Sequence, residues 1–68
     1  MQNRSTEEIK FLKEADVSNM TRYSLPKLRN DRGAGKGIPY YKLGRSVRYR
    51  YSDVISFMER GKVETDND

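Results

Sequence analysis

The sequence predicts a single small α+β domain with three helices and one β-hairpin. Its 68 residues suffice for one domain with a small core. Apolar residues recur at helical spacing in residues 13–21 and again in residues 54–58, whereas apolar and polar residues alternate in residues 40–50. The order of these periods places two short helices first, the hairpin next and one helix last.

The first helix is predicted from about Lys13 to Thr21, because Val17 and Met20 can face a core together. The first eight residues are polar, and Ser5 and Glu8 have the spacing of a capping box, whereas Ile9, Phe11 and Leu12 supply apolar anchors before the helix. The expected organisation has three parts: residues 1–10 are a flexible N-terminal segment, residues 11–61 are the domain, and residues 62–68 are an acidic tail.

The second helix is predicted from about Leu25 to Arg32. Ser24 is a favourable N-cap, and Pro26 falls in the first turn, where its missing N–H has no intrahelical acceptor to lose. Gly33 is expected to end this helix in the left-handed conformation. Two short helices joined by a turn of about three residues form a helix-turn-helix arrangement.

The hairpin is predicted with a three-residue turn at positions 44–46. In that register, four side chains face inward, namely Tyr41, Leu43, Val47 and Tyr49. Three basic side chains face outward, namely Lys42, Arg48 and Arg50. For the last helix, Ser52 is the expected N-cap, Val54, Phe57 and Met58 form the apolar stripe, and Gly61 is the expected stop.

Basic residues are concentrated in the middle of the chain. From Arg22 to Arg50 there are nine Lys and Arg residues and one acidic residue, Asp31, so this segment carries a net charge of +8. The remaining residues carry five basic and nine acidic side chains, a net charge of −4. This asymmetry favours nucleic acid as the partner, and the alternatives are an incidental basic surface, an acidic protein or a lipid surface.

Catalysis, metal binding and cofactor binding are not expected. The chain has no Cys and no His, so it lacks the usual ligands of structural zinc. For the same reason it cannot form a Ser/His/Asp or a Cys/His catalytic site. The segment GAGKG does not match a phosphate-binding loop, because Gly37 follows Lys36 where Ser or Thr is required. We expect no enzyme activity, no small-molecule substrate, no membrane span and a cytoplasmic location.

The run GKGIPYYKLGRSVRYRYSDVISFM resembles the small winged helix-turn-helix domains of phage excisionases and AlpA-type prophage regulators, which are related to the DNA-binding end of the MerR family. KLGR followed by VRY and SD is its most specific part, and it extends over about residues 11–60. Lys13 and Lys27 replace threonines of the family pattern, and Ile38 replaces a proline. The resemblance implies a winged helix-turn-helix fold that binds duplex DNA, in a cytoplasmic protein associated with the nucleoid and of bacterial or phage context.

Docking like these relatives would place the second helix in the major groove and the hairpin, as a wing, at the neighbouring minor groove or backbone. The recognition-helix candidates are Ser24, Pro26, Lys27, Arg29 and Asn30. The backbone candidates are Arg22, Arg32 and Lys36, and the wing candidates are Lys42, Arg45, Ser46, Arg48 and Arg50. Lys27 and Asn30 are expected to read base edges. Alternatively, Asn30 is only an exposed polar residue near the end of a helix. Arg32 could instead form a structural ion pair with Asp31, Asp53 or Glu59.

The implied function is that of a sequence-specific DNA-binding protein of a phage or mobile element. The first hypothesis is an excisionase-like recombination directionality factor that bends DNA at an attachment site, acts with an integrase or recombinase and self-associates on DNA. The alternatives are an AlpA-like transcription regulator of prophage genes and a basic adaptor that binds an acidic protein. Stacking of single-stranded bases on the tyrosines is disfavoured, because Tyr41 and Tyr49 are expected in the core.

Overall fold

The computed structural model describes residues 9–65, which form three helices and a three-stranded antiparallel sheet. The elements in chain order are β1 (Phe11–Leu12), α2 (Glu14–Thr21), α3 (Leu25–Gly33), β2 (Tyr41–Leu43), β3 (Ser46–Arg50) and α4 (Tyr51–Glu59). The α+β prediction is confirmed, and strand β1 is an addition that the sequence did not predict. The expected capping box at Ser5 and Glu8 lies outside the described residues.

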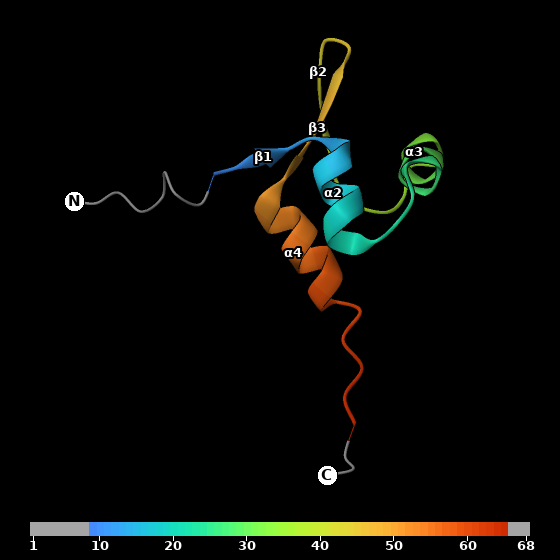
Figure 1. Cartoon of the computed structure of the whole chain (residues 1–68), viewed down its shortest axis with the longest axis vertical. Coiled ribbons are helices and arrows are strands. Elements are labelled where there is room, and N and C mark those ends of the chain that lie inside the picture. The colour runs from blue at the N-terminus through green and yellow to red at the C-terminus, as the bar shows by residue number, and fades with distance from the viewer. Residues whose placement is uncertain (1–8, 66–68) are drawn as a thin grey trace, which may run out of the picture.

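Strand β3 is the centre of the sheet, whose strand order is β1-β3-β2. The β2–β3 hairpin extends away from the helices, and α3 is seen nearly end-on beside α2, so these two helices cross steeply (Figure 1). Within residues 9–65, no helix has the length and apolar character needed to span a membrane.

The turn between α2 and α3 is held by side chains at the end of α2. Arg22 ends α2 in the left-handed conformation, with a φ of 66°, and its N–H donates to the Ser18 carbonyl at 2.7 Å. The Ser18 hydroxyl donates to the Tyr23 carbonyl at 2.6 Å, and the Thr21 hydroxyl accepts from the Tyr23 N–H at 3.1 Å. These bonds satisfy backbone groups that a turn would otherwise leave unpaired, and they fix the direction in which α3 leaves.

Helix α3 begins as predicted and ends later than predicted. The Ser24 hydroxyl accepts from the Lys27 N–H at 3.2 Å, which confirms the N-cap. Gly33 is the last helical residue and is not left-handed, so the predicted cap was wrong. Gly35 takes that conformation instead, with a φ of 71°, and the Lys36 N–H closes the helix end by donating to the Asp31 carbonyl at 2.9 Å.

Gly37 lies where the loop after α3 passes closest to the helix. Its φ is 88°, and a Cβ added there would lie 2.9 Å from the Asp31 Cβ and 3.0 Å from the Asp31 Oδ2. Both the backbone conformation and the lack of space therefore require glycine. The close approach places Ile38, the next residue, in the core at 5% exposure.

The hairpin has a two-residue turn, Gly44 and Arg45, in place of the predicted three-residue turn. Ser46 is consequently paired with Leu43, and Lys42 is paired with Val47. Directly paired residues of antiparallel strands share a face, so the shorter turn moves every β2 side chain to the opposite face from the predicted one. The prediction was correct for the β3 side chains and wrong for the β2 side chains.

Helix α4 begins one residue before the predicted cap. Arg50 is the N-cap residue, and Ser52 lies inside the first turn. The chain passes directly from β3 into the helix because the Tyr51 N–H donates to the Lys10 carbonyl at 2.7 Å, which continues the pairing with β1. The helix ends at Glu59, and Gly61 has no positive φ.

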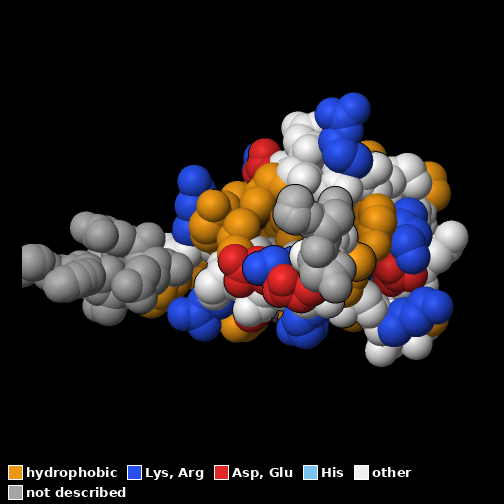
Figure 2. All heavy atoms as spheres, turned by 90° about the horizontal axis from the view of Figure 1, so that it is seen from below, with side chains coloured by type: hydrophobic (Ala, Val, Ile, Leu, Met, Phe, Trp, Pro, Cys, Tyr) orange, Lys and Arg blue, Asp and Glu red, His pale blue; other side chains and the backbone are white. Residues whose placement is uncertain are grey.

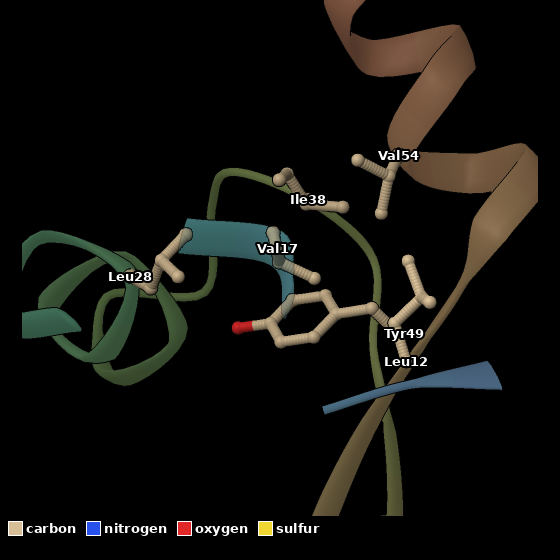
Figure 3. Packing of buried hydrophobic residues seen from close by; sticks show 6 residues of the cluster. All are labelled: Leu12, Val17, Leu28, Ile38, Tyr49 and Val54. Carbon is tan, nitrogen blue, oxygen red and sulfur yellow. The ribbon is translucent and has the colours of Figure 1, made fainter. Parts of the chain in front are cut away.

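The core consists of six buried side chains, one each from β1, α2, α3, the loop after α3, β3 and α4. They are Leu12, Val17, Leu28, Ile38, Tyr49 and Val54. Figure 3 shows the Tyr49 ring in their midst, with its hydroxyl directed toward α3. Tyr49 is the largest fully buried side chain, and its ring packs between the sheet and the helices.

Several side chains expected in the core are exposed. Tyr41 and Leu43 lie on the outer face of the sheet because of the register change. Met58 is exposed at the edge of α4, whereas Val54 is buried and Phe57 is packed against the core. The helical stripe was therefore placed correctly for two of its three members.

Candidate nucleic-acid interface

Helix α3 presents an outer face on which all five recognition-helix candidates are exposed. They are Ser24, Pro26, Lys27, Arg29 and Asn30. Leu28 and Asp31 are the buried residues of the helix and hold it against the core. The structure thus brings the five candidates together along one helix, and leaves their side chains accessible to a partner.

The Lys27 ammonium is anchored on two sides. It lies 3.1 Å from the Asp31 Oδ2, one turn along the same helix, and 5.2 Å from the centroid of the Tyr23 ring. Asp31 is buried to 8% exposure, so this ion pair neutralises a carboxylate that has little access to water. Lys27 therefore has a structural role that the sequence did not predict, and contact with a base edge requires it to swing away from Asp31.

Glu14, at the start of α2, pairs with two arginines of α3. Its Oε2 accepts from the Arg29 Nη2 at 2.6 Å, and its Oε1 accepts from the Arg29 Nε and from the Arg32 Nη1, each at 3.3 Å. The bidentate bond from Arg29 is the main cause that lowers the pKa of the Glu14 carboxyl below its ordinary value. Glu14 therefore stays charged and reduces the positive charge of α3.

Arg32 is committed to the fold. Its Nη1 donates to the Tyr49 hydroxyl at 2.7 Å as well as to Glu14, and its side chain is 17% exposed. Burial lowers its pKa, but the bonds with Tyr49 and Glu14 more than offset this, so the pKa lies above its ordinary value. The structural alternative therefore describes Arg32 well, but the predicted partners were wrong, because Glu14 takes that role.

A shallow hollow of about 370 Å³ lies where α2, α3 and the hairpin meet. Four cationic side chains line it, together with Glu14, Ala15 and Val47; the four are Lys13, Arg32, Arg45 and Arg48. Arg45 comes from the hairpin turn and Lys13 from the residue before α2, so the fold gathers charge from three separate segments. An open site with four cations and one carboxylate suits an anion of the size of a phosphate group.

The remaining predicted cations lie around this region. Arg22 and Lys36 are exposed at the two ends of α3, and Ser46 is exposed beside the hairpin turn. Lys42 is exposed too. The prediction placed it on the same face as Arg48, but the structure places it on the same face as Val47. Arg48 and Arg50 are partly buried on the outer face of the sheet, where the Arg48 Nη1 donates to the Val47 carbonyl at 2.9 Å.

Two residues of this region, Lys13 and Glu14, were not identified as site residues from the sequence. Lys13 was considered only as a helix-capping position, and Glu14 was assigned no role. Because they follow β1, Lys13 lies beside the hairpin and Glu14 lies beside α3. The arginines that Glu14 contacts are 15 and 18 positions away in the sequence. The count of acidic residues between Arg22 and Arg50 excluded Glu14, so it overstated the free charge of α3.

The opposite end of the molecule has a different character. Figure 2, which views the end from which the C-terminal trace projects, shows Lys and Arg side chains spread around the rim, with hydrophobic and acidic side chains between them. Lys62 and Glu64 pair here at 3.4 Å. The described residues form no continuous basic patch in this view, and the interface described above is the better candidate for an anionic partner.

Comparison with protein-family models, with curated proteins and with solved structures found no match. Among residues 9–65, no three Asp or Glu side chains come together as ligands of a metal ion. The resemblance noted in the sequence therefore remains an expectation, and the geometry of this interface is the basis for any function.

Replacing Glu14 with glutamine is expected to reduce stability at neutral pH and to have a smaller effect in acid. Because the pKa of Glu14 is lowered in the folded protein, its stabilisation is present above its unfolded pKa of about 4.3 and is lost as the pH falls through the folded value. At pH 7 we expect a loss of about 1 kcal/mol or less, since the pair is partly exposed.

Urea unfolding of both proteins at pH 7 and at pH 3 measures this difference. Glu59→Gln is the matched control, because Glu59 is exposed and forms no ion pair within the described residues. A difference between wild type and Glu14→Gln that stays constant down to pH 3 would contradict the assigned role of Glu14.

Proposed function

We propose that this chain is a duplex DNA-binding protein of the winged helix-turn-helix type. In the proposed complex α3 enters the major groove and the β2–β3 hairpin lies at the adjacent minor groove or backbone. The single observation that carries the proposal is the four-cation hollow between α3 and the hairpin, since a phosphate seated there would hold both elements against successive parts of one duplex. The exposed outer face of α3 supports the same docking.

The division of labour follows from the contacts. Asn30 is exposed and makes no side-chain hydrogen bond within residues 9–65, so it is available to pair with the edge of an adenine. Lys27 can donate to guanine after it leaves Asp31. Three cations of the hollow form no ion pair within residues 9–65 and neutralise phosphate, namely Lys13, Arg45 and Arg48; this positions the protein without reading sequence.

Within this proposal, an excisionase-like role is the specific function we favour. The domain is small, so one copy offers little surface for a long operator, and several copies bound side by side would bend or coat an attachment site. A circular-permutation gel assay, on sites selected from a random duplex library, tests bending. A site that is bound and stays straight would favour the transcription-regulator alternative.

The base-reading roles predict a specific loss on substitution. Asn30→Ala and Lys27→Ala are each expected to reduce the preference for the selected site over random duplex by about 5-fold or more, because one bidentate base contact is worth about 1–3 kcal/mol. Titration of both duplexes by fluorescence anisotropy measures the ratio. Lys62→Ala, which removes a charge at the far end of the chain, is the control and should leave the ratio unchanged. Equal losses on selected and random DNA would refute base reading by α3.

A further inference from the structure

The outer face of the sheet, which points away from the core, has a composition unlike that of an ordinary wet face. The pairing registers place six side chains on it: Phe11, Tyr41, Leu43, Ser46, Arg48 and Arg50. Three of them are large and apolar or aromatic, two are arginines, and none is acidic. The other face carries Leu12, Val47 and Tyr49 toward the core.

The apolar members of this face are open to solvent. Phe11 is 46% exposed, Tyr41 is 40% exposed and Leu43 is 61% exposed. The Phe11 and Tyr41 rings come from the two outer strands and meet at 5.2 Å in an edge-to-face pair with an interplanar angle of 85°. They form a contiguous aromatic surface across the middle strand that is accessible to a partner.

The arginines on this face are not neutralised by carboxylates. Neither Arg48 nor Arg50 forms an ion pair within residues 9–65, and strands β1, β2 and β3 contain no Asp or Glu. The Arg50 Nε is buried and has no hydrogen-bond partner among the described residues. Exposed rings beside unpaired guanidinium groups are complementary to a ligand that has flat rings and negative charge.

A single strand of nucleic acid has both properties. Unpaired bases stack on aromatic rings and on guanidinium planes, while the backbone supplies a phosphate for each base. Duplex DNA does not fit this face equally well, because its bases are already stacked and only their edges are accessible. A purely apolar protein surface, or a second copy of this face, would bring no charge to match the two arginines.

We infer that the outer face of the sheet binds single-stranded nucleic acid, with bases stacked on Tyr41 and Phe11 and with phosphates at Arg48 and Arg50. This activity goes beyond the proposed duplex binding. It uses no residue of α3 and shares Arg48 with the four-cation hollow. The sequence disfavoured it because Tyr41 was expected in the core, and the two-residue hairpin turn removes that objection.

The test uses the full chain and a fluorescein-labelled oligo-dT of about 12 nucleotides, a length within the usual range of single-strand sites. Tyr41→Ile keeps an apolar, strand-forming side chain but removes the ring, and Tyr41→Phe keeps the ring. We expect the isoleucine variant to lose affinity by between about 5-fold and 150-fold, the range measured for one stacked base, and the phenylalanine variant to bind within about 2-fold of wild type.

Two controls separate this inference from the proposed function. Asn30→Ala should weaken selective binding to duplex and leave oligo-dT affinity unchanged, so loss of one activity without the other identifies the surface responsible. Thermal melting by circular dichroism shows whether each variant folds; if Tyr41→Ile does not, Phe11→Ile serves as the second ring-deleting variant. Equal affinity of the ring-deleting and ring-keeping variants, or no binding of wild type to oligo-dT, would overturn the inference whatever the duplex result.

Discussion

An increase of monovalent salt from 50 to 200 mM is expected to weaken duplex binding by about 1,000-fold. Within residues 9–65, six cations around α3 and the hairpin form no ion pair: Lys13, Arg22, Lys36, Lys42, Arg45 and Arg48. If each neutralises one phosphate, counterion release gives a slope of log affinity against log salt of about −5. Titration of one labelled duplex at five or six salt concentrations measures this slope.

Two variants make the experiment specific. Arg45→Ala should make the slope about 1 unit less negative, because it removes one phosphate contact from the hollow. Asn30→Ala should lower affinity for a selected site and leave the slope unchanged, because its side chain carries no charge. A slope near zero for wild type would rule out the groove-binding geometry.

The largest effect on stability is expected at Gly37. Gly37→Ala should lower the free energy of unfolding by about 2–4 kcal/mol, since the added Cβ meets Asp31 at 2.9 Å and the φ of 88° disfavours any side chain. The displaced Asp31 also carries the ion pair to Lys27, so the perturbation reaches the outer face of α3. Urea unfolding monitored by circular dichroism measures the loss.

The neighbouring glycines provide matched controls for this substitution. Gly35 has a φ of 71° and open space around its Cα, so Gly35→Ala should lose only the backbone contribution, about 1–2 kcal/mol. Gly33 lies inside α3 with no neighbour within 4 Å of an added Cβ, so Gly33→Ala should be neutral or stabilise by up to about 1 kcal/mol. Equal losses at positions 35 and 37 would show that the approach to Asp31 contributes nothing.

Local patterns in the sequence predicted the parts of the fold that depend on local physics. The spacing of Val17 and Met20 placed α2, and Ser24 with Pro26 placed the start of α3, because caps and helical periods involve neighbours a few residues apart. Tyr49 and Val54 were placed in the core for the same reason. Strand β1 was missed because two residues are too few to show a period, and it exists only through its pairing with β3.

The candidate site was harder to predict because its geometry depends on distant contacts. One residue more or less in the turn at Gly44 decides which face carries Tyr41 and Leu43, and alternation alone does not distinguish the two registers. The candidate residues of α3 were identified correctly as exposed, but the charge available there was not. Glu14 neutralises part of it from another helix, and no pattern within residues 22–50 could have revealed that partner.

The contact of Arg32 with Glu14 and Tyr49 joins α2, α3 and β3 through three side chains. Removal of one member leaves the Arg32 guanidinium without one of its two acceptors, or the Glu14 carboxylate without one of its two arginine donors. Single changes at these positions are therefore penalised, and paired changes can restore the balance. Natural sequences that share this fold should therefore vary at positions 14, 32 and 49 together and not independently. Covariation at these three positions would identify relatives that keep the same angle between α3 and the hairpin. It would do so even where the exposed residues of α3 have diverged to recognise other sites.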